Sequence, residues 1–256
     1  MVAYADLDCS VIDELPPGRQ PVETVLIDSS RREQIVERVA SACQQGRQAY
    51  WVCTLIEESD VLEAQAAEVT AAELQLMLPE LSIGLIHGRL KPREKLEIMA
   101  AFKAAEIDLL VATTVIEVGV DVPNASLMII ENSERLGLSQ LHQLRGRVGR
   151  GSQNSHCVLL YSPPISGNSS ARLKIMRETT DGFKIAEKDL ELRGPGEVLG
   201  TRQTGDMQLH IADLQRDAHM LPQIKATAEK LLVNHPENVD PLINRWLGHS
   251  EQYAQA

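Results

Sequence analysis

Short apolar runs alternate with amphipathic segments through roughly the first 160 residues of the chain. The runs are apolar throughout rather than at every second position, which is typical of strands in a parallel sheet that is covered on both faces. Separated by helical segments, they predict an α/β fold with helices flanking a parallel sheet. The predicted strands are residues 24–27, 49–54, 83–86, 108–112, 126–130 and 156–161.

Start and stop signals for helices lie between these strands. Asp28 and the two serines after it can cap a helix that Gly46 ends. Pro92 suits the first turn of a helix that begins at Lys91. A later helix begins at Ser139 and is predicted to carry a run of arginines at its end. The first three predicted helices are residues 31–45, 64–78 and 91–105.

The pattern changes after residue 162, where two prolines and a serine-rich tract mark a boundary. Two short helices, residues 171–179 and 183–192, are predicted to form a hairpin, and a glycine-rich loop follows at 193–205. Further helices are predicted at 212–234 and 242–247. The predicted regions are a lead-in over 1–23, a sheet domain over 24–162 and a mostly helical region over 163–256.

Composition limits the class of protein. The chain has 256 residues, of which 43% are hydrophobic and only 3% aromatic, so we expect an aliphatic core. A net charge of -11 argues against a protein that coats nucleic acid in bulk. No signal peptide and no apolar run of about 20 residues is present, which predicts a cytoplasmic protein with no membrane partner. The cysteines lack metal-ligand spacing and are predicted to be reduced packing thiols: Cys9, Cys43, Cys53 and Cys157.

A basic island lies inside this acidic chain. Seven basic residues and no Asp or Glu occur between Arg135 and Arg177. Within it, Arg145, Arg147 and Arg150 are interleaved with glycines that allow close backbone approach. A lone Arg-Gly-Arg is more often a flexible basic loop. The surrounding island favours a surface that meets a polyphosphate, and phosphoryl transfer in which an arginine stabilises charge on the γ-phosphate.

Other polar residues follow the predicted strands. His87 and Gly88 come after residues 83–86, and Thr113 comes after residues 108–112. Each alone has an ordinary interpretation, such as a packed histidine or a helix cap. Because ligands of open α/β sheets bind outside the carboxyl ends of the strands, the set together predicts a binding edge.

Three segments carry a resemblance to superfamily two helicases. Residues 111–125 resemble motif V, residues 142–151 resemble motif VI, and residues 86–90 resemble the motif IVa region. Residues 181–205 are similar to the translocation motif of the RecG family of bacterial fork-remodelling helicases. The resemblance covers nearly the whole chain and implies a RecA-like second helicase lobe followed by a helical hairpin and loop.

The resemblance also implies roles for individual residues in ATP hydrolysis. Gln143, Arg147 and Arg150 match motif VI and would be the catalytic residues of this chain. Arg147 and Arg150 would reach the γ-phosphate, with Arg150 as the inserted arginine. Gly119 and Asp121 match the motif V residues near the nucleotide ribose and the cleft between the lobes.

The remaining matches concern DNA. In the family, closure of the two lobes on ATP moves the hairpin, which levers its loop along the duplex. The residues that would hold the nucleic-acid backbone are His87, Gly88 and Thr113. The residues that match the translocation motif are Arg172, Arg193 and Gln203, and hydrogen bonds from Arg172 to Arg193 would form the lever.

Two motifs of an ATPase are missing from the sequence. It contains neither a Gly-x-x-x-x-Gly-Lys-Ser/Thr loop nor an Asp-Glu box. The resemblance places both in a first lobe upstream, so ATP and Mg²⁺ would be bound mainly by that absent lobe. We therefore expect the C-terminal motor half of a helicase, inactive alone. Its expected partners are branched double-stranded DNA, the upstream lobe and wedge domain, and single-stranded DNA-binding protein.

Two alternatives stay open at this point. The transcription-repair coupling factor Mfd shares the translocation motif, so the chain could be the matching region of that protein. A standalone nucleic-acid-binding or protein-interaction module would explain the missing phosphate-binding loop. The full set of motif V and motif VI residues argues against such a module, because a module of that kind has no use for an arginine aimed at ATP.

Overall fold

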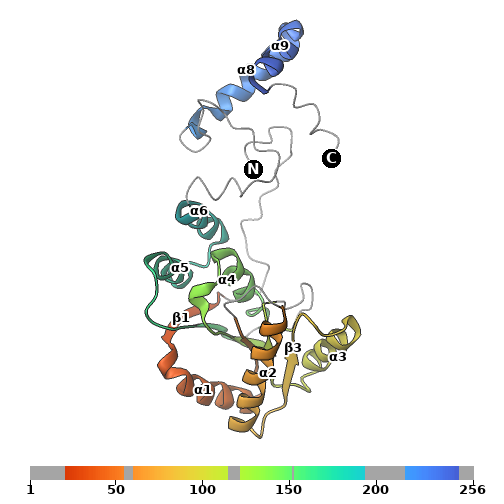
Figure 1. Cartoon of the computed structure of the whole chain (residues 1–256), viewed down its shortest axis with the longest axis vertical. Coiled ribbons are helices and arrows are strands. Elements are labelled where there is room, and N and C mark those ends of the chain that lie inside the picture. The colour runs from red at the N-terminus through yellow and green to blue at the C-terminus, as the bar shows by residue number, and fades with distance from the viewer. Residues whose placement is uncertain (1–20, 55–59, 115–121, 152, 194–216, 248–256) are drawn as a thin grey trace. The chain divides into compact units, whose positions relative to one another are not determined.

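The computed structural model describes residues 21–54, 60–114, 122–151, 153–193 and 217–247. The described chain falls into two compact units (Figure 1). One holds every described strand and helices α1 to α6, and the other holds helices α8 and α9. We predicted the hairpin helices to belong with the C-terminal region, but they lie in the unit of the sheet. The boundaries predicted at residues 23 and 162 stay predictions.

The first unit is built on a six-stranded, fully parallel sheet with the order β1-β6-β5-β2-β4-β3. Every residue of the central strands β2, β4 and β5 is buried, which explains their continuous apolar sequences. All six predicted strands are confirmed. Their bounds are β1 Glu23–Asp28, β2 Gln48–Val52, β3 Ile83–Ile86, β4 Leu109–Ala112, β5 Ala125–Ile130 and β6 His156–Tyr161.

Helices cover both faces of the sheet. One apolar core lies between the sheet and α1 and α2, and a second core lies between the sheet and α3 to α6 (Figure 1). In the second core, the rings of Tyr50 and Phe102 meet edge to face with centroids 4.9 Å apart. The helix bounds are α1 Arg32–Gln44, α2 Asp60–Met77, α3 Pro92–Lys103, α4 Leu138–Arg145, α5 Gly167–Glu178 and α6 Gly182–Arg193.

The predicted helix signals are present in the structure. Asp28 Oδ1 accepts a hydrogen bond from Ser30 N at 2.9 Å, and so caps the short 3-10 turn that leads into α1. Gly46 ends α1 with a φ of 82°, which favours glycine. Pro92 occupies the first turn of α3, where Glu94 Oε2 accepts from Lys91 N at 2.9 Å.

Helix α4 differs from the prediction at its C-terminal end. It was expected to carry all three arginines, but it ends at Arg145 and is capped by Gly146. Gly149 has a φ of 81°, a left-handed conformation that a continuing helix does not allow. Arg147 and Arg150 therefore lie on an irregular segment after the helix, and the directions of their side chains are not set by helix geometry.

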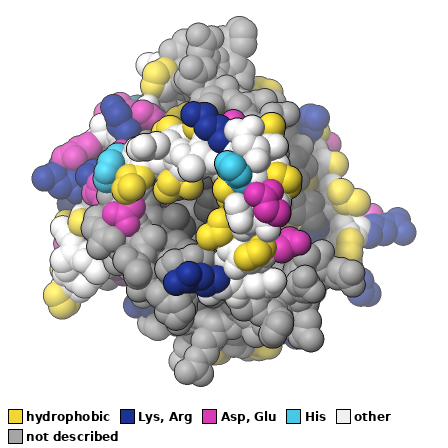
Figure 2. All heavy atoms as spheres, turned by 90° about the horizontal axis from the view of Figure 1, so that it is seen from above, with side chains coloured by type: hydrophobic (Ala, Val, Ile, Leu, Met, Phe, Trp, Pro, Cys, Tyr) yellow, Lys and Arg dark blue, Asp and Glu magenta, His cyan; other side chains and the backbone are white. Residues whose placement is uncertain are grey.

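In the second unit, the described residues form two helices, each preceded by a 3-10 turn: α8 Leu221–Asn234 and α9 Val239–Leu247. The start of the helix predicted at 212–234 lies outside the described residues. Several apolar side chains of this unit are exposed, among them Ile224, Leu232 and Val233. Figure 2 shows that apolar, charged and histidine side chains of the described residues are interspersed on the surface in that view. Within the described ranges, no helix has the length and apolar character to cross a membrane.

Because three thiols are buried, the fold is expected to lose stability at alkaline pH. Burial raises the pKa of Cys53 and Cys157 to about 12 and that of Cys43 to about 11, from an ordinary value of 9.0. Above pH 9 the unfolded chain loses thiol protons that the folded chain retains, so stability falls as pH rises toward the folded values. The loss approaches about 1.4 kcal/mol per pH unit for each thiol.

We expect this loss to be measurable for Cys157 by urea unfolding at pH 8, 9, 10 and 11. The free-energy difference between the wild type and Cys157→Ala should shrink as pH rises, because only the wild type carries that thiol. A difference that stays constant across this range would show that Cys157 ionises equally in both states.

Candidate nucleotide and nucleic-acid interface

The segment after α4 presents the predicted ATP-facing arginines. Arg147 is half-buried, and its side chain has neither an ion pair nor a hydrogen bond to another described residue. Arg150 is also half-buried, and its Nε donates to the carbonyl of Gly146 at a long 3.5 Å. Gln143 is exposed on α4. The guanidinium of Arg147, which has no carboxylate partner among the described residues, suits the oxygens of a phosphate.

The third arginine has a different environment. Arg145 is only 3% exposed, and its Nη1 donates to Met176 O at 2.8 Å, Thr179 O at 2.9 Å and Thr24 Oγ1 at 3.3 Å. The two carbonyls lie at the C-terminal end of α5, where the helix dipole favours a cation. Burial lowers the pKa of Arg145. The expectation that all three arginines meet a polyphosphate is therefore wrong for Arg145, which joins α4 to α5 and β1.

Helix α4 also contacts the start of α6. Arg145 Nη2 lies 3.2 Å from His142 Nδ1, which must accept because a guanidinium only donates. On its other side, His142 packs against Gly182, where an added Cβ would lie 3.2 Å from His142 Nε2. The arginine-bearing helix is therefore in close contact with both helices of the hairpin.

Two predicted DNA-contacting residues lie side by side at the carboxyl ends of β3 and β4. Thr113 N donates to Ile86 O at 3.2 Å, which places Thr113 next to His87. His87 Nδ1 and Thr113 Oγ1 are buried and have no hydrogen-bond partner among the described residues, while His87 Nε2 lies 3.6 Å from Glu68 Oε1. Buried polar atoms without partners are rare, so they mark a place where a ligand could bind. Gly88 is exposed, with open space around it.

The structure places these two groups at different edges of the sheet. His87 and Thr113 lie at the carboxyl ends of their strands. The arginine segment returns toward the amino ends, since Arg145 reaches Thr24 near the start of β1 and Gly151 touches Pro123 just before β5. The sequence alone did not predict this division.

The Gly151 contact yields a stability prediction. A Cβ on Gly151 would lie 2.3 Å from Pro123 O, a backbone atom that cannot rotate away. We therefore expect Gly151→Ala to destabilise the fold by about 1–3 kcal/mol and to displace the neighbouring Arg150 segment. Gly167→Ala is the matched control, because nothing lies within 4 Å of a Cβ there. Equal thermal unfolding midpoints for the two variants would contradict the prediction.

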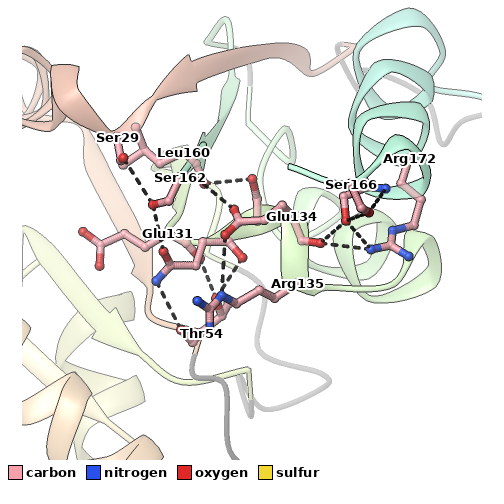
Figure 3. Close-up of polar contacts among 12 residues, drawn as sticks. Ser29, Thr54, Glu131, Glu134, Arg135, Leu160, Ser162, Ser166 and Arg172 are labelled. Atoms are coloured by element: carbon pink, nitrogen blue, oxygen red, sulfur yellow. Dashed lines mark hydrogen bonds and ion pairs between the residues drawn. The ribbon is translucent and has the colours of Figure 1, made fainter. Parts of the chain in front are cut away.

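A hydrogen-bonded turn after β5 connects three strand ends (Figure 3). Asn132 has a φ of 47°, the left-handed conformation that asparagine tolerates. Thr54 Oγ1, after β2, donates to Glu131 O at 2.6 Å. Ser162, after β6, donates through Oγ to Asn132 Oδ1 at 3.3 Å and through its backbone N to Glu134 Oε2 at 3.4 Å. This turn is thereby held in one position at the carboxyl edge.

Arg172 links that turn to the hairpin. Its Nη2 donates to Glu134 O at 2.9 Å and to Ser169 Oγ at 3.1 Å, and Figure 3 shows it reaching from α5 toward the turn. Helix α5 is therefore attached to the carboxyl edge through Arg172 and to α4 through Arg145. The predicted hydrogen-bond chain from Arg172 to Arg193 stays a prediction, since the side chain of Arg193 is not among those described.

Some residues of the candidate site were missed from the sequence, and some predicted ones lie outside the described chain. Thr54, Asn132, Glu134 and Ser162 were not predicted, although polar residues directly after strands were the signal that identified His87 and Thr113. Within the described residues, no cluster of His, Cys, Asp and Glu could hold a metal ion. The predicted residues that lie outside are Gly119, Asp121 and Gln203.

Comparison with known proteins agrees with this architecture. Residues 26–152 match the family described as "Helicase conserved C-terminal domain". Residues 179–247 match "ATP-dependent DNA helicase RecG, domain 3, C-terminal", a region that includes α6, α8 and α9. The first match includes the arginine run, and the second begins just before α6, the second helix of the hairpin.

Curated relatives match along the whole chain. The ATP-dependent DNA helicase RecG of Escherichia coli K12 is 63% identical over 257 residues, covering 100% of this chain and 37% of the relative. The RecG of Aquifex aeolicus is 46% identical over 246 residues, covering 93% of this chain and 31% of the relative. The chain thus spans about a third of the length of these relatives.

A solved structure, described as RecG bound to a three-way DNA junction, superposes with a TM-score of 0.67 at 44% identity. The match covers 85% of the present chain and 28% of the RecG chain in that structure. The fold is therefore the RecA-like second lobe of a helicase, and these relatives favour RecG over the coupling factor Mfd. By its sequence along its whole length and by its fold, the chain belongs to the RecG helicase family and corresponds to a C-terminal fragment of its members.

Proposed function

We propose that the chain is the C-terminal motor portion of an ATP-dependent double-stranded DNA translocase that remodels stalled forks and branched DNA in recombination and repair. By the full-length protein we mean this chain together with an upstream region like that of its relatives. The observation that carries the proposal is the attachment of the arginine-bearing α4 to the hairpin through Arg145, whose Nη1 bonds the end of α5. A shift of α4 on nucleotide binding would be transmitted to the hairpin.

The nucleotide-facing residues would be Arg147, Arg150 and Gln143, together with Gly119 and Asp121. ATP supplies the phosphoryl group, with Mg²⁺ held mainly by the upstream lobe. The residues present fit this role, because Arg147 is a half-buried guanidinium without a partner among the described residues. This chain's own contribution is to place positive charge beside the γ-phosphate and so stabilise the charge that develops there.

The DNA-facing residues would be His87, Gly88 and Thr113 at the carboxyl edge. This assignment is supported by the buried atoms of His87 and Thr113, which lack a partner in the part of the chain that the structure describes, and by the open space at Gly88. In the hairpin and loop, the translocation residues would be Arg172, Arg193 and Gln203. Branched DNA as the substrate is supported by the related RecG structure with a three-way junction.

The remaining partners follow from the family resemblance. They are the upstream RecA-like lobe, the wedge domain and single-stranded DNA-binding protein, and a cytoplasmic location has the same basis. A standalone binding module is the competing function, and the length of the relatives argues against it, because each has about two-thirds of its sequence outside the region matched.

The test is to compare DNA-stimulated ATP hydrolysis by this chain alone with that by the full-length protein. Hydrolysis should be negligible for the chain alone, because it lacks the phosphate-binding loop, and should appear in the full-length protein. Robust hydrolysis by the chain alone, or no hydrolysis by the full-length protein, would refute the proposal.

A further inference from the structure

Helix α2 is apolar on two sides. Its inner side packs on the sheet through buried Ala64, Ala67 and Leu74. On its outer side, Leu62, Val69 and Leu76 are 39%, 58% and 84% exposed. A helix that is apolar around most of its surface is normally buried on all sides. The outer side of α2, which we call the α2 stripe and define by Leu62, Val69 and Leu76, is therefore left open by the part of the chain that the structure describes.

The spacing of the α2 stripe is that of a helix-packing seam. Its members are seven residues apart, so with about 3.6 residues per turn they lie within about 40° of one another. Exposed Gln65 and Ala72 occupy the intermediate positions, and the short side chain of Ala72 would allow another helix to approach closely. Apolar or small residues that alternate at spacings of three and four are the pattern along which two helices pack with side chains interdigitated.

The charge around the α2 stripe decides what can cover it. Helix α2 contains four acidic residues and no basic residue. Glu68 and Glu73 flank the stripe, with side chains 55% and 56% exposed, and their ion-pair distances to His87 and Arg32 are long, at 3.6 and 3.7 Å. A nucleic acid or an anionic membrane would be repelled by this face, and so would the same face of a second copy. A helix whose apolar seam is flanked by Lys or Arg complements it.

We propose that the α2 stripe is the docking surface for a basic amphipathic helix that belongs to the upstream part of the full-length protein. The inference rests on the proposed function, in which this chain works joined to upstream residues. The relatives matched over the whole of this chain have 63% of their length outside it, which is ample to supply such a helix. Docking there would hold the upstream part on the α1–α2 side of the sheet, opposite the face that carries the hairpin.

The first test places a photo-crosslinking phenylalanine derivative at position 76 of the full-length protein. Position 37 is the matched control, since Glu37 is exposed on α1, the other helix on this face of the sheet. We expect position 76 alone to form an intramolecular crosslink to an upstream peptide with apolar residues at seven-residue spacing beside Lys or Arg. A crosslink to a second copy, to another protein or to a peptide without basic residues would overturn the proposal, and so would a yield no higher than the control.

The second test uses charge. On an open surface flanked by Glu68 and Glu73, lysine at position 76 would be tolerated better than glutamate. Against a basic helix the order reverses, so Leu76→Lys should unfold at a lower temperature than Leu76→Glu by about 2 °C or more. Gln75→Lys and Gln75→Glu are the controls, because residue 75 points about 100° away from Leu76 and should not show the reversal. Lysine tolerated as well as or better than glutamate at position 76 would refute docking.

The unmodified full-length protein is assayed first for DNA-stimulated ATP hydrolysis. Failure there would count against the proposed function itself. Normal hydrolysis together with failure of the crosslink or of the charge reversal would count against the docking surface alone.

Discussion

Replacing Arg150 with alanine in the full-length protein is expected to lower kcat for DNA-stimulated ATP hydrolysis by about 10³-fold or more. An arginine inserted beside the γ-phosphate neutralises charge that is largest in the transition state, so its loss affects kcat more than the binding of ATP. Arg150→Lys should restore little, because an ammonium group lacks the planar pair of donors. Steady-state kinetics at saturating DNA measure the effect.

The structure explains why this loss should be confined to chemistry. Arg150 lies on the irregular segment after α4, and its described hydrogen bond to Gly146 O is long at 3.5 Å. Because this segment is part of neither a strand nor a helix, the fold should persist when the side chain is removed. Arg147→Ala is expected to act in the same direction, since Arg147 lies on the same segment.

Arg177→Ala is the matched control, because Arg177 is exposed on α5 within the same basic island and has no predicted role in ATP hydrolysis. It should hydrolyse ATP at the parental rate. A drop of less than about tenfold for Arg150→Ala, with the fold intact by thermal unfolding, would remove Arg150 from the nucleotide site and leave Arg147 as the remaining candidate.

The strands and the fold class could be predicted because their signal is local. A strand buried on both faces must be apolar throughout, and the runs at β2, β4 and β5 satisfy this directly. The strand order β1-β6-β5-β2-β4-β3 could not be predicted, because it depends on contacts between distant segments. For the same reason, the sequence could not show that α5 and α6 pack in the same unit as the sheet.

The candidate site was predictable only in part. Glycine spacing and charge identified the arginine run, and the resemblance to motif VI singled out Arg147 and Arg150, but neither showed what Arg145 contacts. The structure supplies this: α4 ends at Arg145, and the Arg145 side chain contacts the carbonyls of Met176 and Thr179, which lie more than 30 positions away in the sequence. Burial of an arginine against carbonyl oxygens leaves no local signature.

The turn after β5 shows a second limit of the sequence. Asn132 adopts a left-handed conformation, and Ser162 and Thr54 bind it from other strands. Each residue alone is an ordinary polar residue at a strand end. Only the order of the strands makes them neighbours, so the support that this turn gives to Arg172 through Glu134 could not be predicted.

Replacing Arg145 with methionine is expected to destabilise the chain by about 1–3 kcal/mol, because it leaves buried hydrogen-bond acceptors unsatisfied. Methionine fills much of the same space but donates no hydrogen bond. The carbonyls of Met176 and Thr179 would lose their shortest described donor at 2.8 and 2.9 Å, and His142 Nδ1 would lose a donor at 3.2 Å.

Urea unfolding of the parent and of Arg145→Met measures this difference. Arg177→Met is the control. Because Arg177 is exposed, this change should alter the free energy of unfolding by less than about 0.5 kcal/mol. Amide hydrogen exchange should locate the effect at the end of α5 and the start of α6, where Arg145 and His142 make contact. A loss below about 1 kcal/mol, or exchange that rises evenly over the sheet, would show that the hairpin is held to α4 by apolar packing alone. In that case a shift of the arginine segment on ATP binding would reach the hairpin through Leu141, Leu144 and Met176 of the shared core, and not through this guanidinium.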